Sequence, residues 1–289
     1  MFNALVEGDC RSACDSVAIK NFIDFTDFLS RDPGRFGTGI NYKRFFHNFE
    51  EATQEFISSL VKFEYEHCAG WNSFRKNTLR LISMRFLHKV FKRLHLGFDL
   101  TPNRKHYFTN ISRNEFIKAA QEYIDALFTP IIRENGGEYF VIDQAVSAVR
   151  YRIGMDLVRD SKLIVADRDP RDNYADLILA NWGIGREFAK SRDVRKFIEI
   201  FRGLRRSNNQ MKEDSDVLML RFEDLIYHYD ESLKRIAEFA ELDLNDHVNK
   251  REFFNPDVSI KNVGMWKEII SQQEADTIAS ALPEFLYKI

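Results

Sequence analysis

The segment 161–176, Ser-Lys-Leu-Ile-Val-Ala-Asp-Arg-Asp-Pro-Arg-Asp-Asn-Tyr-Ala-Asp, constrains the fold more than any other part of this chain. Residues 162–167 carry a continuous apolar run that is typical of a buried parallel strand. Asp169 is suited to cap the helix that should follow, and Pro170 fits the first helical position because it needs no amide partner. The sequence therefore predicts a strand joined directly to a helix N-terminus, with Arg168 just outside the helix.

Two hypotheses for this turn remain open. In open α/β sheets, ligands bind beyond the carboxyl ends of the strands, and a helix N-terminus beside a guanidinium is suited to bind phosphate. The first hypothesis is therefore an anion site around Arg168. The second is a charged turn in which Arg168 and Arg171 merely pair with three neighbouring carboxylates.

Composition limits the class of protein. A chain of 289 residues can form one large α/β domain or two small ones, and it can bury a sizeable core. Its 13 glycines and 6 prolines are few for that length, which favours long helices. The net charge of −2 excludes a globally basic nucleic-acid binder. We therefore expect no nucleic-acid partner, and any anion site must be local.

Cysteine usage and hydropathy bear on the cellular compartment. Cys10, Cys14 and Cys68 are the only cysteines and form no Cys-x-x-Cys pair, which supports neither a disulfide framework nor a zinc site. No apolar run is long enough to span a bilayer, and the N-terminus lacks an export signal. We therefore expect a cytoplasmic protein with no membrane span and no metal.

The segment 47–135 is predicted to be a mainly helical insertion. Apolar residues recur at helical spacing in Glu51–Cys68 and in Ser73–Leu96, where Lys and Arg crowd the rest of the helix. That basic surface is either simply solvated or binds an acidic saccharide, a nucleic acid or a membrane. Ser112 and Glu115 match a capping box, which predicts a further helix beginning there.

A strand, a helix and a second strand are predicted in order in the middle of the chain. Tyr139–Val146 has the apolar character of a buried strand interrupted by Asp143 and its neighbour, and Ser147–Arg159 would form the crossover helix. The strand at Lys162 would then complete a right-handed βαβ unit.

The remainder of the chain also alternates between helix and strand. Asp172–Arg205 is predicted to be mainly helical, and Val217–Arg221 to be a short strand. Ser271 and Glu274 match a second capping box, which would open the last helix. Since no repeats or linkers interrupt this pattern, we expect a single α/β domain over residues 1–289.

Three segments, in order, resemble one family. They are Lys-Leu-Ile-Val-Ala-Asp-Arg-Asp-Pro-Arg-Asp at 162–172, Val-Leu-Met-Leu-Arg-Phe-Glu-Asp-Leu at 217–225 and Lys-Asn-Val-Gly-Met-Trp-Lys at 261–267. They are similar to the 3′-phosphate-binding strand and turn, the following strand and turn, and the C-terminal glycine-tryptophan loop of sulfotransferases that use 3′-phosphoadenosine 5′-phosphosulfate. The resemblance covers roughly the C-terminal half of the chain.

The resemblance implies a P-loop-like parallel sheet flanked by helices. It also implies transfer of a sulfuryl group from 3′-phosphoadenosine 5′-phosphosulfate to a hydroxyl or amine, which leaves adenosine 3′,5′-bisphosphate. Carried over by position, Arg168 would hold the 3′-phosphate, while Lys261 and the backbone from Asn262 to Gly264 would close on it. Trp266 would pack the loop down.

The sequence departs from the family in two places. Family members commonly have a serine where this chain has Asp176, and a carboxylate there would repel a phosphate. The family's 5′-phosphosulfate loop also has no clean counterpart. Either Gly8–Cys14 is a degenerate version of it, with Arg11 and Ser12 near the sulfate, or Met1–Gly8 is already the helix that follows that loop. In the second case the chain would be truncated and could not catalyse by itself.

The family comparison also suggests a base. Asp143 is placed like the family's acid/base residue, although it could equally be a polar residue that ties down a loop. His88, His95 and His106 are less favoured bases. The basic helix favours a saccharide or polysaccharide acceptor. One alternative is a non-catalytic relative that binds a nucleotide or acidic glycan. The other is a P-loop kinase-like enzyme, but the sequence has no Gly-x-x-x-x-Gly-Lys-Ser/Thr loop.

Overall fold

The computed structural model divides the chain into two compact units, residues 1–142 and residues 143–289, where the sequence indicated one domain with an insertion at 47–135. It is mixed α/β and mostly helical, with two small sheets among the described residues. The described residues are 1, 5–6, 11–31, 41–67, 86–87, 89–91, 93, 104–180 and 183–288, with the side chains of 11–13 left aside.

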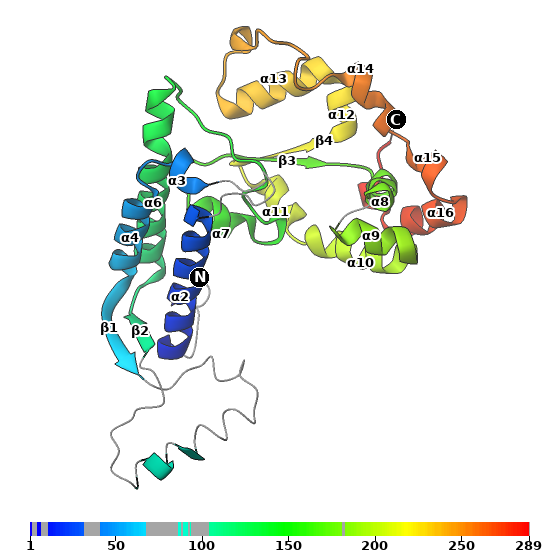
Figure 1. Ribbon diagram of the computed structural model, residues 1–289. Coiled ribbons are helices and arrows are strands. Elements are labelled where there is room, and N and C mark those ends of the chain that lie inside the picture. The colour runs from blue at the N-terminus through cyan, green and yellow to red at the C-terminus, as the bar shows by residue number, and fades with distance from the viewer. Residues whose placement is uncertain are drawn as a thin grey trace. The chain divides into compact units, whose positions relative to one another are not determined.

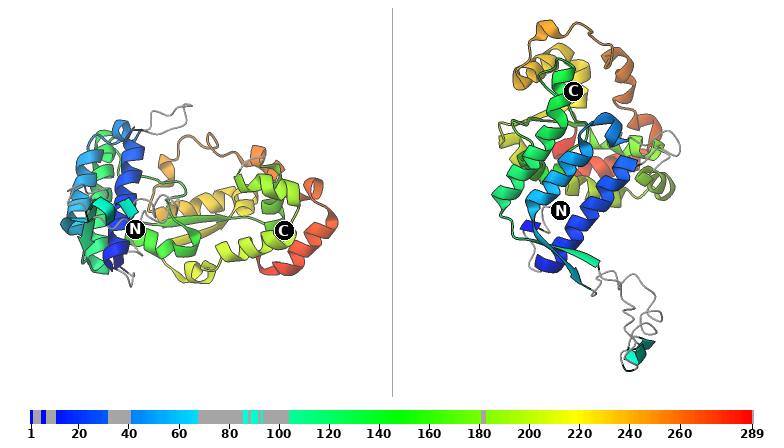
Figure 2. Two further views of the ribbon diagram at one scale, coloured as in Figure 1. Left: turned by 60° about the horizontal axis from the view of Figure 1, so that its bottom comes forward. Right: turned by 60° about the vertical axis from the view of Figure 1, so that its left-hand side comes forward.

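Unit 1 contains helices and one antiparallel pair of strands. In Figures 1 and 2, the helices α2, α4 and α6 lie side by side. The strands β1 and β2 pair antiparallel, from Val61 opposite Thr109 to His67 opposite Arg104. The elements are α2 (Arg11–Arg31), α3 (Tyr42–Phe45), α4 (Phe49–Leu60), β1 (Val61–His67), β2 (Arg104–Thr109) and α6 (Arg113–Glu134).

An aromatic core holds the three helices of unit 1 together. The rings of Phe56 on α4 and Tyr123 on α6 stack with centroids 4.9 Å apart, and Phe22 of α2 meets Phe56 edge to face at 5.4 Å. The hydroxyl groups of Thr53 and Tyr123 hydrogen-bond to each other at 3.0 Å. Aromatic rings from α2, α4 and α6 therefore pack against one another in the core of this unit.

The predicted capping box is confirmed, and one predicted helix is wrong in its second half. The hydroxyl of Ser112 accepts the amide of Glu115, whose carboxylate accepts the amide of Ser112 in return. The helix predicted over Glu51–Cys68 ends at Leu60 instead, and β1 follows at once. The sequence of β1, Val-Lys-Phe-Glu-Tyr-Glu-His, alternates with a period of two, and that pattern suits a strand.

The predicted basic helix Ser73–Leu96 falls mostly outside the described residues. Within it, residues 86–87, 89–91 and 93 are described, and they are helical. His88 and His95 also lie outside the described residues, whereas His106 lies on β2 with its ring stacked on Tyr65.

Unit 2 contains a parallel pair of strands and many helices. The pair consists of β3 (Leu163–Asp167) and β4 (Val217–Arg221), in register from Leu163 opposite Val217 to Asp167 opposite Arg221. The α-helices are α7 (Tyr151–Asp156), α8 (Pro170–Leu179), α9 (Gly183–Ser191), α10 (Val194–Leu204), α11 (Asn208–Glu213), α12 (Phe222–Tyr227), α13 (Tyr229–Ala240), α14 (Pro256–Ser259), α15 (Trp266–Ile269) and α16 (Gln272–Ala281). Short 3-10 helices are η2 (Ala148–Arg150), η3 (Leu244–Asp246), η4 (Ile260–Asn262) and η5 (Pro283–Phe285).

The predicted strand at Tyr139–Val146 is wrong. The segment is a loop with a turn, and Val141 in its middle is 96% exposed. Gln144 adopts a left-handed backbone conformation with φ of 55°, which is incompatible with a strand. The βαβ connection therefore runs from β3 through α8–α11 to β4, and the predicted crossover helix at 147–159 is reduced to η2 and α7.

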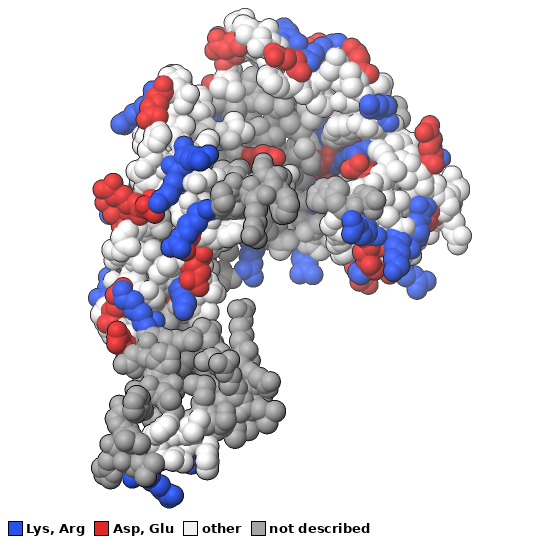
Figure 3. All heavy atoms as spheres, in the orientation of Figure 1, with Lys and Arg blue, Asp and Glu red and all other residues white. Residues whose placement is uncertain are grey.

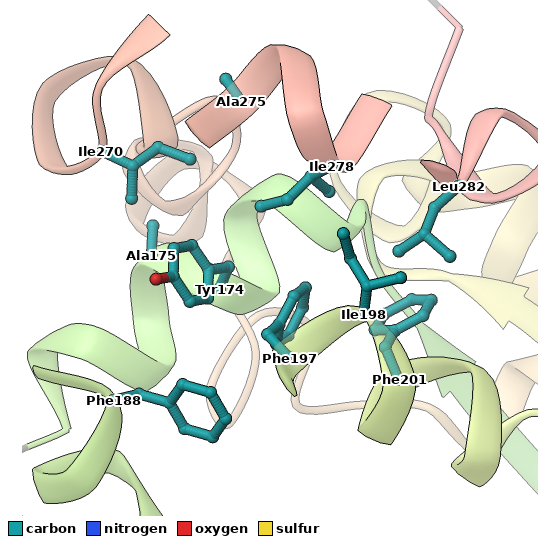
Figure 4. Close-up of a cluster of buried hydrophobic side chains, with 10 residues drawn as sticks. All are labelled: Tyr174, Ala175, Phe188, Phe197, Ile198, Phe201, Ile270, Ala275, Ile278 and Leu282. Atoms are coloured by element: carbon teal, nitrogen blue, oxygen red, sulfur yellow. The ribbon is translucent and has the colours of Figure 1, made fainter. Parts of the chain in front are cut away.

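The core of unit 2 fixes the position of α8. Figure 4 shows Tyr174 and Ala175 of α8 packed against Phe197 of α10 and Ile278 of α16. Fully burying a large apolar side chain stabilises a fold by about 1.5–3 kcal/mol, so this cluster strongly resists movement of α8. The helical region 172–205 and the capping box at Ser271 are both confirmed.

Candidate anion site at the end of strand β3

The turn between β3 and α8 is built as the sequence predicts. The carboxylate of Asp169 accepts the amide of Arg171 at 2.9 Å and so caps the helix, and Pro170 occupies its first turn. Strand β3 ends at Asp167, whose carboxylate accepts the amide of Arg168 at 3.0 Å. Arg168 is therefore held between a strand end and a helix start.

The guanidinium of Arg168 lies against the loop that precedes α15. Its Nη2 donates to the backbone oxygen of Asn262 and to the sulfur of Met265. Its central carbon lies 5.1 Å from the ring centre of Phe222. The side chain is 15% exposed, and its Nε is buried with no hydrogen-bond partner among the described residues. A buried donor without an acceptor costs about 1–3 kcal/mol, so this group is suited to receive an anion.

The structure separates the two arginines of the turn. Arg171 pairs with Asp169 through two hydrogen bonds of 2.9 and 2.7 Å. Among the described residues, the one carboxylate that Arg168 contacts is that of Asp176, 3.9 Å from its Nη1 and 66% exposed. The carboxylate of Asp167 pairs with a different arginine, Arg205, which donates to it at 2.6 and 3.1 Å. The charged-turn hypothesis therefore describes Arg171 well and Arg168 poorly.

Asp172 connects α8 to the loop that precedes α15. Its side chain is 1% exposed, and its two oxygens accept the amides of Gly264 at 2.8 Å and Trp266 at 3.0 Å. Burial raises the pKa of Asp172 despite these two bonds and the nearby Arg168, both of which lower it. Gly264 has φ of 75°, a conformation that a residue with a side chain rarely adopts. The loop is thus tied to the helix that carries the site.

A second buried carboxylate links the turn after β3 to the turn after β4. Glu223, fully buried in the first turn of α12, accepts the amide of Asp169 at 2.7 Å. The Nε of Arg221 lies 3.4 Å from the other oxygen of Glu223. The sequence marked this segment as a family motif but assigned Glu223 no role.

Tyr287 also reaches both turns. Its amide donates to Asp169 at 3.0 Å, and its hydroxyl donates to Asp224 at 2.9 Å. The hydrogen bonds from Arg171 and Tyr287 lower the pKa of Asp169, although burial opposes that shift. Sequence reasoning missed Tyr287, because a tyrosine near the end of the given chain carries no signal of its partners.

The structure brings together three of the five site residues predicted from sequence. Arg168, Asn262 and Gly264 lie at the same cluster. Lys261 lies beside them in sequence, with an exposed side chain in η4. Asp143 lies in an exposed turn before η2 and takes no part in the described contacts of this cluster.

The predicted counterparts of the 5′-phosphosulfate loop are only partly described. Residues 2–4 and 7–10 fall outside the described residues, so the proposal that Met1–Gly8 is a helix is not resolved there. From Arg11 onward the chain belongs to α2, and Arg11 and Ser12 are therefore in a helix.

The surface and the metal-ligand inventory give context to the site. On the face drawn in Figure 3, Lys and Arg side chains are interspersed with Asp and Glu. Within the described ranges, no three His, Cys, Asp or Glu side chains gather as metal ligands, and no helix is long and apolar enough to cross a bilayer.

The sequence matches no protein-family model, and no curated protein and no solved structure is significantly similar to it.

Proposed function

We propose that this chain is a sulfotransferase-like protein whose β3–α8 turn and 261–267 loop bind the 3′-phosphate of 3′-phosphoadenosine 5′-phosphosulfate. The observation that carries the proposal is the contact of Arg168 with the backbone of Asn262. The two segments that resemble the family's 3′-phosphate site are far apart in sequence, yet they meet at a helix N-terminus beside a parallel strand. The proposal includes a P-loop-like sheet of which β3 and β4 form part.

The residues present fit one half of such a nucleotide. Arg168 offers a buried Nε that has no hydrogen-bond partner in the described part of the chain, and its planar guanidinium suits the oxygens of a phosphate. Gly264 fits less directly, because its amide donates to Asp172 and is not free for a phosphate. Asp176 opposes binding and would have to turn toward solvent.

The proposed chemistry needs a donor nucleotide, an acceptor hydroxyl or amine, and a base. When bound, the nucleotide would supply the sulfuryl group. The chain would hold the nucleotide through Arg168 and would position a saccharide acceptor, whose proton Asp143 would take as the base. The exposed position of Asp143 leaves it open to a large acceptor.

A non-catalytic binder of nucleotides or acidic glycans is the second candidate. One observation favours it: Arg11 and Ser12, offered as part of a 5′-phosphosulfate loop, lie in helix α2. A P-loop kinase-like enzyme has less support, because the sequence contains no phosphate loop of the required form.

Calorimetry with three nucleotides tests the binding half of the proposal. We expect adenosine 3′,5′-bisphosphate to bind better than ATP or NAD, because only the bisphosphate presents a 3′-phosphate to Arg168. Arg168→Ala should weaken bisphosphate binding by about 1.5–3 kcal/mol, the range for a hydrogen bond to a charged group, or roughly 10- to 150-fold. Arg168→Lys should recover only part of the loss, because it keeps the charge without the planar fork.

Arg152→Ala is the matched control for that experiment. It removes a guanidinium that pairs with Asp214 and Asp216 before β4, at the opposite end of the parallel strands, so it should cause no selective loss of bisphosphate affinity. Equal affinity for all three nucleotides in the wild type would count against the family assignment. An Arg168→Ala variant that melts early yet is stabilised by bisphosphate as strongly as the wild type would remove Arg168 from the site.

A transfer assay separates the two candidate functions. Radiolabelled 3′-phosphoadenosine 5′-phosphosulfate and a saccharide acceptor should give a labelled saccharide if the chain is a sulfotransferase. Asp143→Asn should then lower turnover and leave bisphosphate affinity unchanged, as expected for a base. Bisphosphate binding without any transfer would favour the non-catalytic candidate.

A further inference from the structure

The C-terminal segment 283–288 crosses the two turns that form the candidate site. At Asp169, in the β3–α8 turn, the carboxylate accepts the amide of Tyr287 at 3.0 Å. At Asp224, in the first turn of α12, the carboxylate accepts the hydroxyl of Tyr287 at 2.9 Å. One residue therefore bridges the ends of both strands of the parallel pair.

The segment is anchored on both sides of this bridge. Leu282, which precedes it, is fully buried in the core of unit 2, and the ring of Phe285 meets that of Phe201 edge to face at 5.3 Å. Arg221, the last residue of β4, donates to the backbone oxygen of Phe285 at 2.9 Å. The ring of Tyr287 itself stacks on Tyr227 with centroids 6.2 Å apart. These contacts fix the position of the segment that follows α16.

The chemistry of the bridge holds over a wide pH range. Burial and the hydrogen bond to Asp224 raise the pKa of Tyr287 to about 12. The hydroxyl therefore remains protonated and donates to Asp224 at any ordinary pH. On the other side, Asp169 is 3% exposed and remains an acceptor, because its pKa is lowered by its partners against the effect of burial.

We propose that segment 283–288, through Tyr287, is a positioning element that holds the turn carrying Arg168. Asp169 is the next residue after Arg168 and caps α8, so the position of Asp169 determines where the side chain of Arg168 leaves the backbone. Glu223 ties the amide of Asp169 to the second turn, and Tyr287 ties the carboxylate of Asp169 to the same turn. A site held from both sides binds more tightly, because less ordering is left to the binding step. The ligand in this inference rests on the proposed function.

Tyr287→Phe is the perturbation that tests the inference. It removes only the hydroxyl that bonds Asp224 and keeps the ring and the amide, so the unit should still fold. Asp224→Ala removes the same bond from the other side, and the double variant closes a thermodynamic cycle. Tyr229→Phe is the matched control, because its ring stacks on Phe254 at 6.3 Å outside this bridge.

The first readout needs no ligand. Hydrogen–deuterium exchange of residues 168–173 should be faster in Tyr287→Phe and in Asp224→Ala than in the wild type, with no further increase in the double variant. It should be unchanged in Tyr229→Phe. Wild-type exchange at 168–173 in Tyr287→Phe overturns the inference. Equally faster exchange throughout unit 2 also overturns it, because that result shows general destabilisation and no specific hold on the turn.

The second readout is the affinity for adenosine 3′,5′-bisphosphate. Tyr287→Phe and Asp224→Ala should each weaken it roughly fivefold, the equivalent of losing one ordinary hydrogen bond, and the double variant should lose no more than either single change. If the wild type binds bisphosphate and the two variants bind it with the same affinity, the positioning role is overturned. A wild type that binds no bisphosphate sinks the proposed function, and the exchange of residues 168–173 then decides the inference by itself.

Discussion

Replacing Asp176 by a neutral residue should strengthen the binding of adenosine 3′,5′-bisphosphate. The Oδ2 of Asp176 lies 3.9 Å from the Nη1 of Arg168, the group proposed to hold the 3′-phosphate. In the sulfotransferases that the sequence resembles, a serine commonly occupies this position. A carboxylate at this position would compete with the proposed phosphate for Arg168 and would repel it, and both effects should disappear in Asp176→Asn.

The expected gain follows from Coulomb's law. A phosphate oxygen bonded to Arg168 at about 2.8 Å would place its charge about 5 Å from the carboxylate. One pair of unit charges at that distance interacts by about 0.8 kcal/mol in water and about 3 kcal/mol at an effective dielectric constant of 20. Because the side chain of Asp176 is 66% exposed, the value near the water limit applies. Asp176→Asn should therefore improve affinity by about 1 kcal/mol, or roughly fivefold.

Calorimetry at two salt concentrations distinguishes this repulsion from other effects. The gain in Asp176→Asn should shrink as salt rises, because the interaction is screened over about 8 Å at physiological ionic strength. Asp176→Ser should bind at least as well, since its hydroxyl can also donate to the phosphate. Glu187→Gln on α9 removes an exposed carboxylate elsewhere in unit 2 and is the control. No gain in Asp176→Asn, or a gain no larger than that in Glu187→Gln, would refute the placement of the phosphate beside Arg168.

Two further predictions concern stability. Gly185→Ala should destabilise unit 2 by about 1–3 kcal/mol in urea unfolding, because a Cβ there would lie 2.6 Å from the backbone oxygen of Leu177. Gly203→Ala should instead stabilise it by about 0.5–1 kcal/mol, because a Cβ there would meet open space. Burial would raise the pKa of Glu274, but hydrogen bonds from Arg192 and from the helix cap lower it below 4.5. The ionised carboxylate therefore stabilises the fold above pH 4.5, and this contribution is lost as the pH falls through the lowered pKa. Unfolding midpoints from pH 7 to pH 3 should therefore fall less steeply in Glu274→Gln, and parallel curves would contradict this role.

The sequence predicted best those features that depend on adjacent residues. Both capping boxes are formed, because each needs only a hydroxyl and a carboxylate three residues apart. The β3–α8 junction was predictable for the same reason: the apolar run, Asp169 and Pro170 all lie within a few residues of one another. These signals are local, so no long-range contact was needed to interpret them.

One error arose where two patterns were both present, and another where an apolar segment had no partner strand. Over Val61–His67, residues at helical spacing continued the pattern of α4, but the alternation with a period of two prevailed because β2 was available as a partner. Around Tyr139–Val146, apolar composition suggested a strand, yet no neighbouring strand pairs with it among the described residues. A strand requires a partner, and the partner cannot be read from the segment itself.

The candidate site shows the same division between local and distant information. From sequence, Asp172 is a residue that favours a helix N-terminus, because a carboxylate there interacts well with the free amides of the first turn. In the structure its oxygens instead bind the amides of Gly264 and Trp266, which lie 92 and 94 residues away. Because Asp172 lies in the first turn of α8, close after Arg168, these two bonds hold the loop against the turn that carries Arg168. The direct contact of Arg168 with Asn262 is therefore supported by a buried carboxylate, and a ligand that enters between Arg168 and Asn262 would have to replace that contact.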